Sequence, residues 1–174
     1  MSSRRGQILE TAAELFAKRG FHGVSMADLG AACGISGPAL YKHFDGKEAI
    51  LATMLVDISQ RLLEEGRRRD SLNALVDWHV DFALTYPALI VVQDRDWSAL
   101  PDQAREQVRS LQLAYIEEWV KALQQQRPQM SAEEAQARLH ATFGLINSTP
   151  RSARIDPTAM RGLLTQMALA ALLA

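Results

Sequence analysis

The chain has 174 residues, of which 48% are hydrophobic and 22% are charged, and its formal net charge is −1. This length and composition fit a globular protein with one good core or two small ones. The near-neutral charge argues against a protein that coats nucleic acid without sequence preference, because such binding depends on many basic contacts. The single cysteine, Cys33, excludes an intrachain disulfide and is interpreted as a packed thiol rather than a redox sensor.

Helical periodicity runs through the whole chain. Apolar residues recur at intervals of three and four, and no alternating run bounded by turns indicates a strand. The sequence therefore predicts an all-α protein of about nine helices. The first helix is predicted over residues 4–19, with Ile8, Ala12 and Phe16 on its inner face and Gly20 at its end.

Residues 25–44 predict two short helices joined by a tight turn. Ser25 is placed to cap the first of them, and Ser36 is placed to cap the second. Gly34 supplies the turn between them, since glycine adopts a positive φ at little cost. Two short helices with this connection are typical of a helix-turn-helix motif.

The second helix of this pair is predicted to present an outward surface. Leu40 and Phe44 face inward, which leaves Tyr41, Lys42 and His43 directed toward solvent. Such a helix can enter a DNA groove, and free N–H groups at neighbouring helix N-termini can bind phosphates. The predicted DNA-binding residues are Ser25, Met26, Ser36, Gly37, Pro38, Ala39, Tyr41, Lys42, His43 and Lys47.

The rest of the chain predicts more helices. A fourth is expected over 46–68, and it ends at the basic run 67–69, which is either a solvated helix end or a contact to the DNA backbone. The later helices are expected over 71–86, 88–93, 101–127, 131–147 and from 156 onward, with a polar-aromatic loop over 94–100 and a break over 147–151.

Aromatic residues are spread over this rear segment. Each is explained either by core packing or by a ligand cavity, which combines apolar walls with a few polar groups. Arg95 is either a solvated loop charge or a partner for a carboxylate or phosphate on an effector. The predicted effector-binding residues are Trp78, His79, Phe82, Arg95, Trp97, Tyr115, Trp119 and Phe143.

Residues 4–63 resemble the N-terminal domain of TetR-type repressors. The shared residues are Ile8-Leu9, Leu15-Phe16, Gly20-Phe21, Gly23, Ser25-Met26, Leu29, Ala32, Gly34, Ile35, Ser36, Ala39-Leu40-Tyr41, His43-Phe44 and Lys47-Glu48. The resemblance implies a homodimeric DNA-binding repressor with a helix-turn-helix domain over 1–48 and an effector-binding and dimerisation domain over 49–174. Gly30, Gly37 and Pro38 depart from the commonest family pattern, so the operator sequence does not carry over.

The rear segment carries a weaker resemblance. Residues 86–119 are similar to a subgroup of this family that often responds to acyl-CoA or other lipid-like ligands. In the family pattern the last two helices form a four-helix interface with a partner, whereas the alternative is a purely internal core. The predicted interface residues are Leu139, Phe143, Ile146, Met160, Leu163, Leu164, Met167 and Ala171.

We therefore expect a transcription regulator, a repressor that leaves a near-palindromic operator when a small hydrophobic or acyl-CoA-like effector binds. The alternatives are a nonspecific DNA-binding protein and an enzyme. No histidine pair at ligand spacing, Gly-rich phosphate loop or nucleophile elbow points to catalysis, a metal or a cofactor. Without a signal peptide or an apolar run of about 20 residues, a cytoplasmic location without membrane contact is expected. The effector, the operator, the regulated genes and the direction of the ligand's effect stay open.

Overall fold

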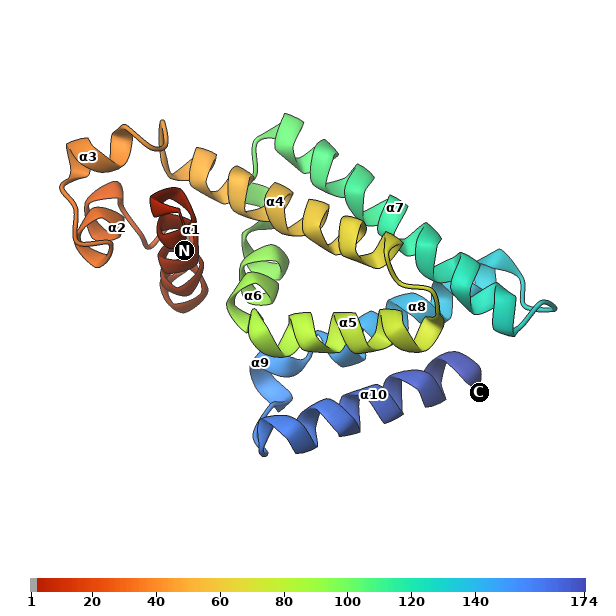
Figure 1. Cartoon of the computed structure of the whole chain (residues 1–174). Helices are drawn as coiled ribbons and strands as arrows, with labels where there is room; N and C mark the ends of the chain where they lie inside the picture. Colours follow the sequence, from red (N-terminus) through yellow and green to blue (C-terminus); the bar gives the residue numbers. More distant parts are fainter. Residues whose placement is uncertain (1–2) are drawn as a thin grey trace. The chain divides into compact units, whose positions relative to one another are not determined.

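The structure is a computed structural model that describes residues 3–174, and these residues form helices and no strand (Figure 1). The all-α prediction is confirmed. Among the described residues no single helix is long and apolar enough to cross a membrane, although Leu72–Thr85 and Pro87–Ala99 pass that test as a bent pair. The elements are α1 (Arg4–Arg19), α2 (Met26–Ala32), α3 (Gly37–Tyr41), α4 (Lys47–Arg67), α5 (Leu72–Thr85), α6 (Pro87–Asp96), the 3-10 turn η1 (Trp97–Ala99), α7 (Asp102–Gln126), α8 (Ala132–Ile146), α9 (Thr149–Ser152) and α10 (Pro157–Leu173).

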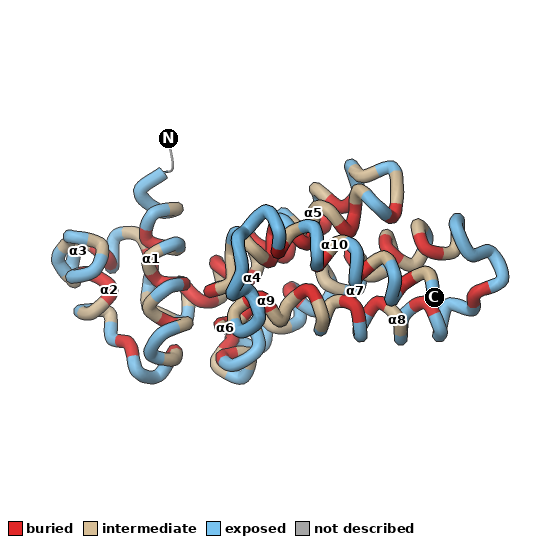
Figure 2. Tube along the Cα trace, turned by 90° about the horizontal axis from the view of Figure 1, so that it is seen from below, coloured by how far each residue is buried: buried red, intermediate tan, exposed pale blue. Residues whose placement is uncertain are grey.

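The chain divides into two compact units. Unit 1 contains the chain up to Ile58 together with Ala88–Val108, and unit 2 contains Ser59–Pro87 together with Arg109–Ala174. Buried positions recur at intervals along the helices, with exposed positions between them (Figure 2). This is the pattern of amphipathic helices that each bury one face. The predicted domain boundary after residue 48 stays a prediction.

Serine caps begin both helices of the short pair in unit 1. The Ser25 hydroxyl accepts a hydrogen bond from the Asp28 N–H at 3.1 Å, and the Asp28 carboxylate accepts one from the Ser25 N–H at 2.8 Å. This reciprocal pair is a capping box. The hydrogen bonds from Ser25 stabilise the carboxylate and lower the pKa of Asp28 from 3.8 to about 2. The Ser36 hydroxyl likewise accepts from the Ala39 N–H at 3.3 Å.

The turn between α2 and α3 requires two glycines. Gly34 has a φ of +66°, as predicted for the turn. Gly30 lies inside α2 and permits a close approach of the turn backbone, because a Cβ there would lie 2.9 Å from the Ile35 carbonyl oxygen and 3.4 Å from the Gly37 nitrogen. The turn therefore packs directly on the α2 backbone, which fixes where α3 begins.

Replacing Gly30 by alanine should destabilise the protein, although alanine favours a helix by roughly 1 kcal/mol over glycine. The added Cβ must displace backbone rather than a flexible side chain, and we expect a net loss of about 1–3 kcal/mol in the free energy of unfolding. Urea unfolding followed by circular dichroism measures this. Gly37→Ala is the matched control, because its Cβ meets nothing within 4 Å, and it should leave stability unchanged or slightly raised. Equal stability of the Gly30→Ala variant and the wild type would contradict the close approach.

The predicted loop over 94–100 is wrong. The helix α6 continues to Asp96, and η1 follows at once. Arg95 explains the difference, because its guanidinium donates to the carbonyls of Phe16 and, at 3.0 Å, Ala17 at the end of α1. The same guanidinium pairs at 3.1 Å with Asp96, which is buried. Contacts with a helix almost 80 residues earlier thus order a segment whose composition is typical of a loop.

Unit 2 is built around α5, α8 and α10. The last helix packs against both of the others. Ser71, Ser131 and Asp156 cap these three helices. The short α9 occupies the predicted break, and its Thr149 hydroxyl donates to the Ala83 carbonyl at 2.8 Å. This hydrogen bond ties the connection to α5.

Candidate functional site

The outward surface of α3 matches the sequence prediction in most respects. Tyr41 is 53% exposed, and Pro38 and Lys42 are exposed beside it. Lys42 is the C-cap residue of α3, and His43 lies beyond the helix and is only half-exposed. His43 is therefore a flanking residue of the helix rather than part of it. Ser36, Gly37 and Ala39 complete the start of this surface.

Two arginines of α1 hold the turn and the end of α3 in place. Arg4 donates to the Cys33 carbonyl at 2.8 Å, in the turn that precedes α3. Arg5 donates to the His43 carbonyl at 2.6 Å, beyond the end of α3, and its guanidinium lies 4.0 Å from the Phe44 ring centroid. Neither arginine is among the residues predicted to have a role. The signal in the sequence was that both arginines lie in the first turn of an amphipathic helix, from where a long side chain can reach neighbouring segments.

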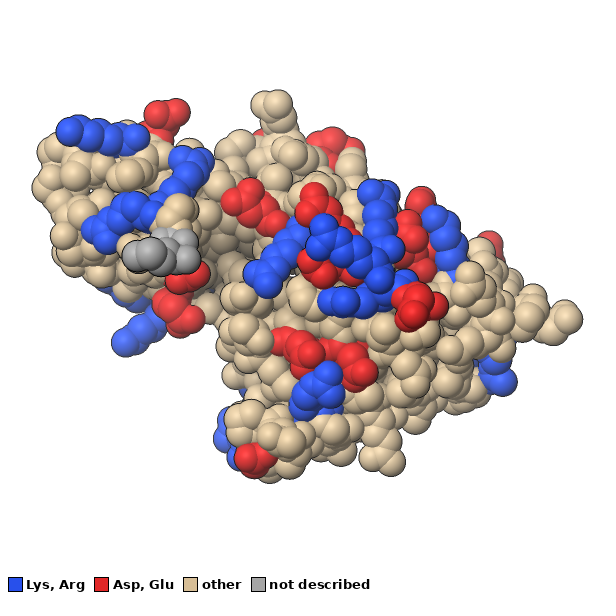
Figure 3. All heavy atoms as spheres, viewed as in Figure 1, with Lys and Arg blue, Asp and Glu red and all other residues tan. Residues whose placement is uncertain are grey.

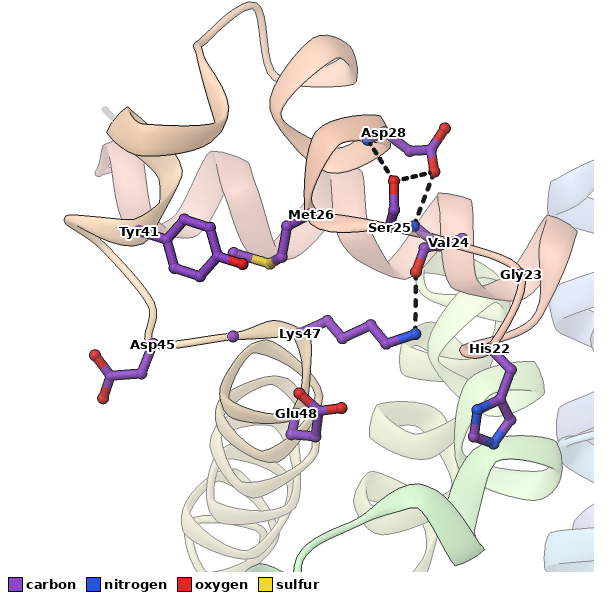
Figure 4. A pocket seen from close by; sticks show the side chains of 11 residues that line it. His22, Gly23, Val24, Ser25, Met26, Asp28, Tyr41, Asp45, Lys47 and Glu48 are labelled. Carbon is purple, nitrogen blue, oxygen red and sulfur yellow. Dashed lines mark hydrogen bonds between the residues drawn. The ribbon is translucent and has the colours of Figure 1, made fainter.

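A groove opens beside Tyr41 (Figure 4). Its volume is about 580 Å³, and the Tyr41 ring and the Met26 side chain lie next to each other on one side of it. The N-terminal ends of α2 and α4 both border this groove. Its lining residues are His22, Gly23, Val24, Ser25, Met26, Asp28, Tyr41, Asp45, Gly46, Lys47 and Glu48.

Lys47 forms internal contacts within this groove. Its ammonium donates to the Val24 carbonyl at 3.2 Å (Figure 4). It also donates to the Phe21 carbonyl at 3.1 Å and lies 4.5 Å from the Phe21 ring centroid. An ammonium has three donors, so one is left for a phosphate. Ser25 is likewise engaged, since its hydroxyl donates to Asp28 at 2.5 Å. Both residues fix the shape of the groove, and their contact with DNA stays a prediction.

Three carboxylates also line the groove, and sequence reasoning missed their role there. Asp28 is tied to the capping box, whereas Asp45 and Glu48 are exposed near the start of α4. A phosphate that enters the groove meets free N–H groups at helix N-termini but also these negative charges. The groove could therefore orient a phosphate through backbone N–H groups, but its net charge is not strongly positive.

Five of the predicted effector residues gather in the interior of unit 2. The rings of His79, Tyr115 and Phe143 are inclined to one another by 34° or less, with centroids 4.7–6.1 Å apart. The Trp119 ring stands nearly perpendicular to all three. Phe82 lies at 5.7 Å from His79. We call these five residues the aromatic cluster.

His79 is the polar centre of the aromatic cluster. Its Nε2 lies 3.2 Å from Asn147 Oδ1, and its Nδ1 lies 3.3 Å from the Tyr115 hydroxyl. With Nε2–H donating to the amide oxygen, Nδ1 accepts the Tyr115 proton, so the ring is satisfied while neutral. Burial lowers the pKa of His79 from 6.5 to about 4, against the opposing effect of the Asn147 hydrogen bond. Burial also raises the pKa of Tyr115. The cluster is therefore uncharged at neutral pH.

Three predicted effector residues lie elsewhere. Trp78 precedes His79 on α5, but its ring faces the guanidinium groups of Arg61 and Arg69. Arg95 and Trp97 belong to unit 1, and Arg95 is engaged with the end of α1. The structure gives Arg95 a structural role, and its contact with an effector stays a prediction.

The predicted partner-contact residues separate by burial. Four of them are at most 4% exposed and belong to the core of unit 2: Leu139, Ile146, Met160 and Leu164. These four side chains pack within their own chain and expose almost no surface, and their contact with a partner stays a prediction. Leu163 and Met167 are 42% and 43% exposed, and Ala171 is exposed on the same helix. Phe143 is half-buried in the aromatic cluster. Because α10 is apolar on both sides, periodicity does not separate its inner face from its outer face.

The capped helix pair, its glycine turn and the exposed α3 define a helix-turn-helix protein of the DNA-binding kind. The family model described as "Bacterial regulatory proteins, tetR family" matches residues 8–54, and the model described as "Tetracyclin repressor-like, C-terminal domain" matches residues 65–151. The chain belongs to the TetR family of bacterial regulatory proteins, as its resemblance implied.

Individual relatives agree with this family. A TetR-family transcriptional regulator from Bordetella parapertussis 12822 is 30% identical, with a TM-score of 0.83 over 97% of this chain and 95% of that one. The HTH-type transcriptional activator FasR from Mycolicibacterium smegmatis is 36% identical over 87 residues, which are 45% of this chain and 40% of FasR. The match thus spans less than half of that relative. The structure of AibR in complex with isovaleryl coenzyme A and operator DNA shares the fold, at 21% identity and a TM-score of 0.76 over 95% of this chain and 97% of AibR.

Proposed function

We propose that the protein is a homodimeric transcription regulator that represses its target genes and leaves its operator when a small hydrophobic or acyl-CoA-like effector binds. The observation that carries this proposal is the surface of α3. Tyr41 and Lys42 are exposed on it, and the arginines of α1 hold the flanking turn and the end of the helix. Side chains fixed in this way can read a DNA groove without first being ordered, which lowers the entropic cost of binding.

The aromatic cluster supports the choice of effector. It combines apolar rings with a few polar atoms on His79, Tyr115 and Asn147, which is the usual make-up of a small-molecule site. AibR, which shares this fold, is described with isovaleryl coenzyme A and operator DNA. An effector lowers DNA affinity only if it binds better to a conformation that fits the operator poorly. Couplings of this kind are typically about 1–3 kcal/mol.

The outer face of α10 supports a dimer. Leu163, Met167 and Ala171 expose apolar surface there, and Ala141 and Gly144 are exposed on α8, which packs against α10. Small residues allow the helices of a second copy to approach closely, and a twofold axis would pair each face with itself. A dimer presents two copies of α3, which suits half-sites about 34–36 Å apart on a near-palindromic operator.

The proposed role is regulatory rather than catalytic, since the relatives that match are named as transcription regulators. A repressor acts where the genome is, so we place the protein in the cytoplasm. Neither a metal nor a cofactor forms part of the proposal.

Binding of the purified chain to the DNA upstream of its own and neighbouring genes tests the proposal. We expect that one such fragment binds at least about a thousandfold more tightly than random DNA, with an affinity that falls as salt rises. Sedimentation should give twice the chain mass of 19.3 kDa. Equal affinity for random and promoter DNA would favour the nonspecific alternative, and a monomer on the operator would remove the dimer from the proposal.

A further inference from the structure

A surface of unit 2 gathers arginines around one aromatic side chain. The Arg61 and Arg69 guanidinium carbons lie 5.9 and 5.2 Å from the Trp78 ring centroid. Arg61 also lies 5.5 Å from the Tyr86 ring centroid and donates to the Tyr86 hydroxyl at 3.1 Å. We call Arg61, Arg69, Trp78 and Tyr86 the Arg–Trp surface. In the view of Figure 1, Lys and Arg atoms gather beside Asp and Glu atoms on the face where α4 ends (Figure 3).

The positive charge of this surface is incompletely neutralised within the chain. Arg61 forms no ion pair with any carboxylate of the described residues, and a phenol takes only one of its five N–H donors. Arg69 pairs with Glu65 at 3.3 Å, but Glu65 also pairs with Arg68 at 2.7 Å. One carboxylate thus serves two guanidinium groups. Two like charges beside a single indole ring repel each other, and an incoming anion relieves that repulsion.

The geometry suits an oxyanion better than a bare metal or a cation. A guanidinium presents paired N–H donors that match a carboxylate or a phosphate, and a ring beneath it limits its orientation. The indole N–H of Trp78 is buried without a hydrogen-bond partner among the described residues. An oxyanion within reach of this N–H would supply the acceptor that the chain itself does not provide.

The same helix joins this surface to the aromatic cluster. On α5, Trp78 belongs to the Arg–Trp surface, and the next residue, His79, belongs to the aromatic cluster. The surface is charged, whereas the cluster is uncharged and apolar. A ligand that uses both must have an anionic head and an uncharged apolar body.

We propose that Arg61 and Arg69, beside the Trp78 ring, bind the anionic head of an amphipathic effector, a phosphate or a carboxylate, whose apolar body contacts the aromatic cluster. This inference rests on the proposed function, since it specifies the effector of the same regulator. It gives a role to Arg69, which belongs to the basic run 67–69 interpreted from the sequence as a solvated helix end or a DNA contact, and to Arg61, for which the sequence predicted no role.

Three probes of equal chain length test the inference: dodecanol, dodecanoate and dodecyl phosphate, each below its micelle concentration. Calorimetry or Trp fluorescence gives the dissociation constant for the wild type, Arg61→Gln and Arg61→Lys. We expect the wild type to bind at least one anion more tightly than dodecanol. Arg61→Gln should bind that anion about tenfold more weakly and bind dodecanol with unchanged affinity, because the substitution removes a charge-assisted contact. Arg61→Lys, which keeps the positive charge, should lose less affinity for the anion than Arg61→Gln. The tighter of the two anions identifies the head group.

Arg154→Gln is the matched control, because Arg154 is exposed and its guanidinium donates only to the nearby Arg151 carbonyl. It should bind every probe like the wild type. The inference fails if the wild type shows no preference for an anion, or if Arg61→Gln binds all three probes as the wild type does. Operator binding, measured on the same preparations, separates this failure from that of the proposed function. Weaker operator binding by Arg61→Gln without any probe would instead assign the arginine to DNA.

Discussion

A chain that carries both Tyr41→Ala and Lys42→Gln should bind its operator about a hundredfold more weakly than the wild type. Each residue is exposed on or directly after α3, and each offers one hydrogen bond to a charged or polar group of DNA. Such bonds contribute about 1.5 kcal/mol or more apiece, so two of them amount to about 3 kcal/mol. Fluorescence anisotropy with labelled operator DNA at fixed salt measures the loss. The salt dependence should also become shallower, since one lysine contact to phosphate disappears.

The control for this variant is Lys121→Gln, which makes the same charge change on an exposed residue of unit 2. It should bind the operator as the wild type does. Thermal unfolding of the double variant should also match that of the wild type, because neither replaced side chain is part of the core. If the double variant binds the operator as tightly as the wild type does, α3 is not the helix that contacts the DNA bases.

The free energy of unfolding should fall by about 3 kcal/mol as the pH is lowered from 6.5 to 4, through His79 alone. The folded-state pKa of His79 lies near 4, below its ordinary value of 6.5. Between pH 4 and pH 6.5 His79 binds a proton in the unfolded chain but not in the folded chain, so lowering the pH favours unfolding. The contribution is fully present above pH 6.5 and is lost below about pH 4. Urea unfolding across this range measures it.

The variant His79→Gln isolates this contribution. It keeps a polar side chain for Asn147 and Tyr115 but removes the titrating group, so its stability should change less between pH 6.5 and 4. The matched control is His140→Gln, on the exposed side of α8, which should keep the wild-type pH dependence. If His79→Gln shows the same pH dependence as the wild type, His79 is not buried as the structure places it.

Local signals in the sequence were sufficient for most of the fold. Ser25, Ser36, Ser71 and Ser131 each begin a helix where a serine side chain can accept from the backbone two or three residues on. A helix cap depends only on residues that are close together in the chain, so it can be predicted from the local sequence. The glycine turn at Gly34 is predictable for the same reason.

Features that depend on distant contacts were harder to predict. The segment around Arg95 has the composition of a loop, and its hydrogen bonds to the α1 carbonyls help to order it as a helix. The sequence suggests that Lys47 is a surface cation, whereas its ammonium donates to two carbonyls of the connector between α1 and α2. The residues Met160 and Leu163 share an apolar helix, yet one is buried and the other is exposed. In each case the deciding partner lies elsewhere in the chain, and spacing along one helix does not reveal it.

The contact between Arg95 and α1 has a practical consequence for anyone who builds chimeric regulators. A graft that takes only residues 1–48 would separate the Phe16 and Ala17 carbonyls from the Arg95 guanidinium that donates hydrogen bonds to them. Residues 88–108 belong to the same compact unit as α2 and α3, although they come much later in the chain. A transplant that includes this second stretch keeps the end of α1 capped. The portable module is therefore discontinuous, and its borders are set by three-dimensional packing rather than by chain order.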